Sequence, residues 1–163
     1  MKKVFIIFGA PGIGKTTISK ILYKQIDNTQ YIDIDELWRI QPFIVNDINK
    51  NYVETNIKTM YRSFLNHPSL NHLILSWVVP TKGLKDMMTS WFMDAEVYFY
   101  RLVAQKEVYL KRLEDDHRDE TKFEEYMMIN QNQSFDDAMT IDVTHLSIKD
   151  VVDTLLNQIT KHI

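Results

Sequence analysis

A lysine and two hydroxyl side chains directly follow a cluster of glycines near the start of the chain. Gly9, Gly12 and Gly14 are three of only four glycines in 163 residues, and the sequence continues as Lys15-Thr16-Thr17. Glycine inside a regular element costs roughly 0.5–1 kcal/mol relative to alanine, so the cluster indicates backbone that bulkier residues do not supply. A ligand that approaches this backbone closely would explain the composition.

The same segment fits the pattern G-x-x-x-x-G-K-[ST]. In that pattern the loop N–H groups cradle phosphate oxygens, and the helix that follows adds the positive end of its dipole. Lys15 would reach the β- and γ-phosphates, and the Thr16 hydroxyl would ligate a Mg²⁺ that bridges them. A chance match is the alternative, but a buried strand before the motif and a helix after it favour a site for a nucleoside triphosphate. The residues expected to bind it are Gly9, Ala10, Pro11, Gly12, Ile13, Gly14, Lys15, Thr16 and Thr17.

The elements that position this motif alternate along the chain. Strands are predicted at residues 3–8, 31–35, 72–79, 96–103 and 139–143. Helical spacing of apolar residues predicts helices at 16–25, 47–66, around 84–91, at 105–114, at 123–132 and after a capping box at 147–150. Alternating strands and helices predict an α/β fold with a parallel sheet covered on both faces, in a single domain over residues 1–163.

Composition narrows the functional classes. The net charge is −3, so binding to a nucleic acid polyanion is not expected. The chain has no cysteine, so we expect a reducing, cytoplasmic setting. The apolar run at residues 4–8 is too short for a signal peptide core or a membrane span.

Over nearly its full length the chain resembles the small P-loop kinases. This group includes shikimate, gluconate and nucleoside or nucleotide kinases and some antibiotic phosphotransferases. The resemblance rests on the motif at 9–16, Asp-x-Asp at 33–35, an arginine-bearing segment at 112–118 and the final IDVTHLSIKDVV. It implies the three-layer P-loop NTPase fold with strand order 2-3-1-4-5 and a short lid at about 114–122. It also implies phosphoryl transfer from ATP, with Mg²⁺, to a small hydroxylated acceptor, a nucleoside or a nucleotide.

Asp33 and Asp35 are the candidate acids. On the expected strand they alternate and point to one face, at the carboxyl end of the sheet. In kinases that look like this one, one acid holds the metal's water and the other takes the proton of the acceptor hydroxyl. We assign the first role to Asp33 and the second to Asp35. The alternative is a pair of solvated acids that caps the next helix.

Further site residues come from the resemblance and from position. Arg112 is expected near the adenine or the α-phosphate, and Arg118 in the lid, where it would neutralise charge on the transferred group. The residues expected at the acceptor are Trp38, Arg39 and Trp77. For Trp38 the alternative is core packing, and for Arg39 it is a surface position. Two Met-Met dipeptides in the later predicted helices are interpreted as core residues: Met87, Met88, Met127 and Met128.

Two departures from the family pattern leave the function open. Strand three ends in Leu75-Ser76-Trp77 and lacks the acid that many kinases have there, which leaves the second metal ligand in doubt. No Asp-Gly-aromatic-Pro-Arg motif for a nucleoside monophosphate follows that strand. A nucleotide-binding module without catalysis and a kinase of nucleic acid ends therefore stay as alternatives, the second disfavoured by net charge and the short lid. The sequence does not identify the acceptor or the oligomeric state.

Overall fold

Twelve elements make up the part of the chain that the computed structural model describes, which is residues 1–163 without 116, 118–119 and 131–132. The five strands are β1 Lys2–Gly9, β2 Thr29–Asp33, β3 His72–Trp77, β4 Ala95–Val103 and β5 Met139–Asp142. The helices are α1 Lys15–Leu22, the 3₁₀ helix η1 Ile34–Trp38, α2 Asp47–Asn66, α3 Lys82–Trp91, α4 Lys106–Asp115, α5 Thr121–Asn130 and α6 Ile148–Ile159.

All strand pairs in the sheet are parallel, and their order is β2-β3-β1-β4-β5. This confirms the predicted fold class and strand order. The central strand β1 is fully buried from Val4 to Phe8, in agreement with its unbroken apolar sequence. Gly9, the last residue of β1, pairs with Leu102 of β4, so the glycine motif begins at the carboxyl end of the sheet.

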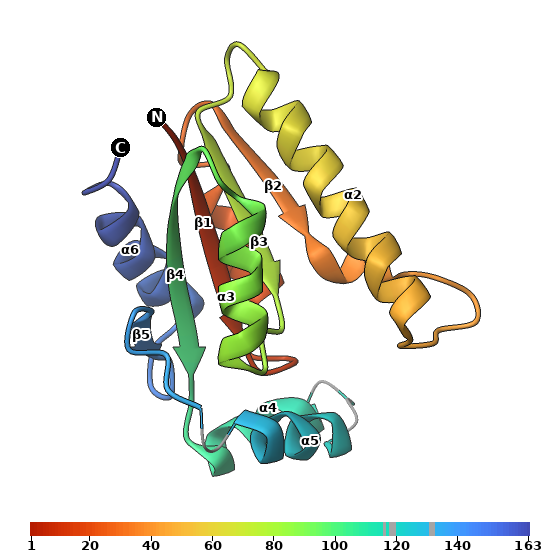
Figure 1. The fold of residues 1–163 in the computed structure, drawn as a ribbon. Coiled ribbons are helices and arrows are strands. Elements are labelled where there is room, and N and C mark those ends of the chain that lie inside the picture. The colour runs from red at the N-terminus through yellow and green to blue at the C-terminus, as the bar shows by residue number, and fades with distance from the viewer. Residues whose placement is uncertain (116, 118–119, 131–132) are drawn as a thin grey trace.

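The two faces of β1 pack into separate cores. Phe5 and Ile7 pack with residues of α1 and α6, whereas Val4, Ile6 and Phe8 pack with residues of α2 and α3. Helices α4 and α5 lie beyond the carboxyl ends of the strands, at the same end as the glycine motif (Figure 1). The result is a three-layer arrangement in which loops at one end of the sheet build the site.

Local signals explain most of the helix boundaries. Thr81 caps α3 by accepting the N–H of Leu84, and Ser147 with Asp150 forms the predicted capping box of α6. Strand β3 ends at Trp77, two residues earlier than predicted, ahead of Pro80, which lacks an N–H for a sheet. None of the helices among the described residues is long and apolar enough to cross a membrane.

The prediction that four methionines fill the core is wrong for three of them. Met88 is fully buried, but Met87, Met127 and Met128 are 42%, 41% and 71% exposed. The buried residues of α3 are Lys85, Met88 and Trp91, and Met87 lines the partly open space that Trp91 also borders.

Candidate active site

The glycine motif forms a loop between β1 and α1. Gly9, Gly12 and Gly14 all have positive φ values, of 154°, 82° and 105°. A Cβ on Gly9 would lie 2.5 Å from the carbonyl oxygen of Leu102, so only glycine fits there without displacing backbone. This confirms the inference that the glycines supply special backbone. The loop and helix α1 border a recess of about 210 Å³, whose lining is Pro11, Gly12, Gly14, Lys15, Thr16, Thr17 and Asp35.

Lys15 is held inside this loop. Its side chain is only 6% exposed, and Nζ donates hydrogen bonds to the carbonyl oxygens of Gly9 at 3.0 Å and Ala10 at 2.8 Å. An ammonium group that is removed from water needs such partners, because burial of an unpaired charge is costly. The loop therefore fixes a positive charge beside the recess before any ligand binds.

Thr16 and Asp33 are in direct contact. The Thr16 hydroxyl donates a 2.7 Å hydrogen bond to Oδ2 of Asp33, which joins the start of α1 to the end of β2. The two oxygens suit Mg²⁺, which is bound in proteins through one or two oxygen ligands together with waters and substrate phosphates. Among the described residues there is no cluster of three or more His, Cys, Asp or Glu side chains that would hold a metal by itself.

Tyr31 and Ser76 complete the network around Asp33, and sequence reasoning did not select them. The Tyr31 hydroxyl donates to Oδ2 of Asp33 at 3.3 Å and lies 2.8 Å from the Ser76 hydroxyl. Burial raises the pKa of Tyr31 to about 12, while the Ser76 hydrogen bond lowers it and the charge of Asp33 raises it. Tyr31 therefore stays a neutral donor to Asp33. Ser76 occupies the strand end at which an acid was noted as missing.

Asp35 does not lie on a strand, and the prediction of a strand over residues 31–35 is wrong in this detail. Strand β2 ends at Asp33, whose carboxylate accepts the backbone N–H of Asp35 at 3.2 Å and thereby starts the 3₁₀ helix η1. This is the turn-forming behaviour of aspartate, and it makes Asp33 a helix cap as well as a partner of Thr16. Asp35 nevertheless lines the recess beside Lys15.

The surroundings of Asp35 disfavour its charged form. The side chain is exposed, but part of its hydration is lost to the surrounding protein atoms, and this desolvation raises the pKa of the carboxyl. Lys15 opposes the shift, and the charges of Asp33 and Glu36 add to it. A carboxylate with a raised pKa is a stronger proton acceptor once it is ionised.

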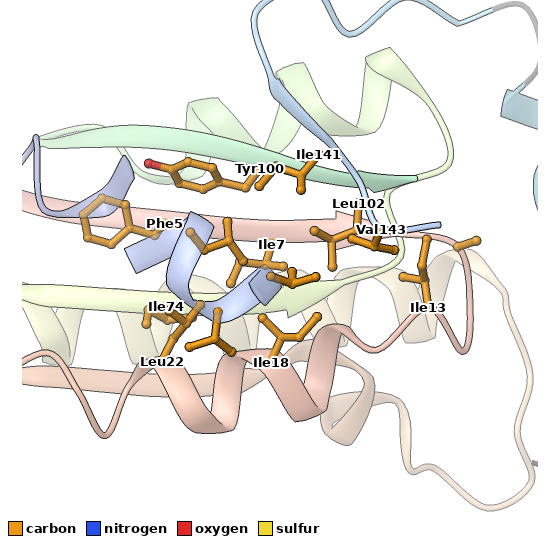
Figure 2. Close-up of a cluster of buried hydrophobic side chains, with 14 of the residues drawn as sticks. Phe5, Ile7, Ile13, Ile18, Leu22, Ile74, Tyr100, Leu102, Ile141 and Val143 are labelled. Carbon is orange, nitrogen blue, oxygen red and sulfur yellow. The ribbon is translucent and has the colours of Figure 1, made fainter. Parts of the chain in front are cut away.

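Arg112 borders a second recess, of about 430 Å³, on the other side of the loop. Its Nη2 donates to the carbonyl oxygens of Val143 at 3.0 Å and Thr144 at 3.2 Å. Ile13 and Val143 belong to the same buried cluster, and Figure 2 shows Ile13 at the end of that cluster near Val143. The lining is Gly12, Ile13, Gly14, Thr17, Ile18, Arg112, Asp115, Val143, Leu146, Ile148 and Val151. This recess has several apolar residues in its walls and adjoins the glycine motif.

Trp38 and Trp77 line a third and larger space of about 710 Å³, which we call the apolar cavity. The structure brings these two predicted residues together, and it adds Trp91 of α3, which was not selected from the sequence. Arg39 is not part of this lining. Its guanidinium pairs with Glu36 at 2.8 Å, and its side chain is 76% exposed. Arg118 lies outside the described residues.

Searches of protein-family models and of curated protein sequences find no match to this chain. Solved structures do match. A sugar kinase from Janibacter sp. HTCC2649 and a gluconokinase from Sinorhizobium meliloti 1021 are each 12% identical with a TM-score of 0.75, over 98% of this chain and 95% and 92% of theirs. The tunicamycin resistance protein of Deinococcus radiodurans is 17% identical, with a TM-score of 0.70 over 98% and 96% of the two chains. The chain therefore has the fold of the small P-loop kinases.

Proposed function

We propose that this protein is an ATP-dependent phosphotransferase that moves the γ-phosphate to a hydroxyl group of a small acceptor. The observation that carries the proposal is the convergence of three functional groups on one recess. Lys15 is buried in the glycine loop, and Thr16 contacts Asp33 at 2.7 Å. Asp35 lines the same recess from the 3₁₀ helix η1. The fold shared with sugar kinases and other kinases supports this function.

The loop and Lys15 bind and orient the phosphates. Backbone N–H groups of residues 12–16 hold the β- and γ-phosphate oxygens, and Nζ of Lys15 neutralises charge on the transferred group. The 430 Å³ recess holds the nucleoside, with Arg112 along its border. Phosphoryl transfer depends mostly on positioning and charge stabilisation, so these residues account for most of the rate enhancement.

The Thr16 hydroxyl and the Asp33 carboxylate are the residues that would hold Mg²⁺. When bound, the ion supplies charge neutralisation at the β- and γ-phosphates. Asp33 would hold the ion through its bound waters, and the hydrogen bond from Tyr31 helps to position this carboxylate. The 3₁₀ turn that Asp33 caps also sets the place of Asp35, so one carboxylate organises both functions.

Asp35 accepts the proton of the acceptor hydroxyl. As the bond between the acceptor oxygen and the γ-phosphorus forms, the bond from that phosphorus to the oxygen of the β-phosphate breaks, and ADP leaves. The acceptor proton passes to Asp35. Trp38 and Trp77 contact the acceptor from the apolar cavity. Two arginines remain predictions from the sequence, Arg39 at the acceptor and Arg118 in a lid.

The test is ADP release across a panel of hydroxylated metabolites and nucleosides, with the Lys15→Ala variant beside the wild type. We expect Lys15→Ala to lower turnover by at least about 10²-fold with the fold intact, because it removes charge stabilisation of the transition state. Lys20→Ala, which removes an exposed lysine from the same helix, is the matched control. Wild-type turnover in folded Lys15→Ala would contradict the assignment. ATP binding without transfer to any acceptor would favour a nucleotide-binding module, and turnover that falls steeply with salt would favour nucleic acid ends.

A further inference from the structure

The apolar cavity has a lining that is unusual for a site that handles charged metabolites. It lies between η1, α2, α3 and α5, and its volume of about 710 Å³ is in the range of pockets for small organic ligands. All three tryptophans of the chain line it, and each comes from a different element: Trp38 from η1, Trp77 from β3 and Trp91 from α3. Val53, Leu84 and Ile129 add aliphatic surface.

The charges at this cavity are already balanced within the protein. Lys50 and Glu54 are the charged side chains of its described lining. Lys50 pairs with Asp47 at 3.5 Å, and Glu54 pairs with Lys58 at 2.5 Å. In the part of the chain that the structure describes, no arginine lines the cavity. An acceptor carboxylate or phosphate would therefore have to compete with Asp47 for Lys50, the cation of the described lining.

The mouth of the cavity is apolar as well. Val45 lines the cavity and is 58% exposed, and Phe43 is 65% exposed. The ring of Phe43 meets that of Trp38 edge to face, with the centroids 6.3 Å apart. Apolar side chains that stay exposed next to a cavity extend the surface on which an apolar ligand can be buried.

The helix η1 connects this cavity to the recess of the phosphates. Asp35 lines the recess and Trp38 lines the cavity, and the two residues are three apart in the 3₁₀ helix. Side chains three residues apart in a 3₁₀ helix lie one above the other, about 6 Å apart along the axis. A molecule that packs on Trp38 can thus present a hydroxyl group to Asp35.

We infer that the acceptor is an uncharged, hydroxylated small molecule with an aromatic or otherwise apolar body, and not a sugar acid or a nucleotide. The inference rests on the proposed function, because it concerns the second substrate of the same site. The apolar body packs between the tryptophans, where flat surfaces gain from ring contacts. A charged group in the same place would lose its hydration without an available partner.

Tryptophan fluorescence tests the inference directly, because every tryptophan of the chain lines the cavity. Three probes separate the features of the ligand. Phenyl β-D-glucoside is neutral and carries an aromatic ring, phenyl β-D-glucuronide adds a carboxylate, and methyl β-D-glucoside lacks the ring. We expect phenyl β-D-glucoside to change the fluorescence in a saturable way, and the other two to need at least about tenfold higher concentrations, which corresponds to about 1.4 kcal/mol.

A variant that narrows the cavity shows whether the signal comes from it. Gly83 lines the cavity, has no positive φ, and has open space around the position of a Cβ. Because a Cβ at this position meets no atom within 4 Å, Gly83→Leu should take up cavity volume and raise the concentration of phenyl β-D-glucoside needed for half-saturation by at least about tenfold. Ser90→Leu, an exposed site on the same helix outside the lining, is the matched control and should bind the probe as the wild type does.

Each outcome decides the matter. The inference is overturned if phenyl β-D-glucuronide saturates at an equal or lower concentration, if phenyl β-D-glucoside leaves the fluorescence unchanged, or if Gly83→Leu binds it like Ser90→Leu.

Calorimetric titration with ATP and Mg²⁺, together with ADP release, addresses the proposed function separately. Failure there would remove phosphoryl transfer, and with it the role of the cavity ligand as an acceptor, even if the probe binds. Normal ATP binding and turnover with a preference for anionic acceptors would overturn the inference alone.

Discussion

Thr16 and Asp33 are 17 positions apart in the sequence, yet the Thr16 hydroxyl donates a 2.7 Å hydrogen bond to the Asp33 carboxylate. The contact joins the phosphate loop to the end of β2. Because the same carboxylate also accepts the N–H of Asp35, the loop, the strand end and the 3₁₀ helix meet at one side chain. Asp33 therefore links Thr16 to the position of Asp35.

Replacement of Asp33 by asparagine should weaken Mg²⁺ binding and so raise the Mg²⁺ concentration that ATP binding and transfer require. The amide keeps the size of the side chain but removes the negative charge that favours a hydrated divalent ion. We expect the Mg²⁺ concentration for half-maximal turnover to rise by about tenfold or more, which is about 1.4 kcal/mol. Calorimetric ATP titrations and turnover, each run against Mg²⁺ concentration, measure the effect. Asp27→Asn, which removes an acid at the other end of β2, is the control, and equal Mg²⁺ profiles for the two variants would contradict the role of Asp33.

Asp35→Asn should lower kcat with the true acceptor by roughly 10²–10⁴-fold, because it removes the general base. Partial desolvation raises the pKa of this carboxyl, so in the wild type kcat/KM should fall as the pH drops through a value above the ordinary aspartate range. ATP affinity should change little. The acidic limb of the pH profile should disappear in Asp35→Asn, and an unchanged limb would assign it to another group.

The same shift has a consequence for stability, and its sign is opposite to that of a salt-bridged acid. A carboxyl whose folded-state pKa is raised favours the folded state when protonated, and this stability is lost as the pH rises through the folded pKa. Asp35→Asn should therefore be at least as stable as the wild type at neutral pH, and the difference should vanish at a pH below the ordinary pKa of aspartate. Thermal melts at several pH values check this, and a destabilised variant at neutral pH would contradict it.

Sequence reasoning predicted those parts of the fold that local signals determine. The run from Val4 to Phe8, the glycine loop, the capping box at Ser147 and the α2 boundaries Asp47–Asn66 were all predicted correctly, because each depends on neighbouring residues. The end of β2 was not. Whether the chain continues as a strand past Asp33 depends on a hydrogen bond from the N–H of Asp35 to the Asp33 side chain, which the alternating pattern does not reveal.

The candidate site divides in the same way. The residues of the phosphate loop follow from one motif, and Trp38 and Trp77 were expected near the acceptor. The inclusion of Trp91 and Met87 in the cavity depends on the placement of α3 against η1 and α2, which no local pattern contains. Tyr31 was missed because a tyrosine in a strand normally indicates packing, and its link to Asp33 and Ser76 arises only when β2 pairs with β3.

Two glycine-to-alanine substitutions should have opposite effects on stability. Gly9 has a φ of 154°, and a Cβ there would lie 2.5 Å from the Leu102 carbonyl oxygen, so Gly9→Ala should lower the free energy of unfolding by about 2 kcal/mol or more. Gly83 lies in α3 with nothing within 4 Å of a Cβ, so Gly83→Ala should raise it by up to about 1 kcal/mol. Urea denaturation measures both, and similar unfolding free energies for the two variants would contradict the strain at Gly9.

Arg112 should contribute to nucleotide affinity as well as to local structure. Its guanidinium bonds to the carbonyl oxygens of Val143 and Thr144 at 3.0 and 3.2 Å, and its side chain borders the recess that we assign to the nucleoside. Arg112→Met keeps an unbranched apolar chain but removes the charge, so the Kd for ATP should rise by about tenfold, or about 1.4 kcal/mol. Calorimetry with ATP and Mg²⁺ measures this, and Lys111→Met, which removes an exposed cation from the preceding position, should leave the Kd unchanged. A drop in melting temperature without a change in Kd would show that Arg112 only ties α4 to the end of β5.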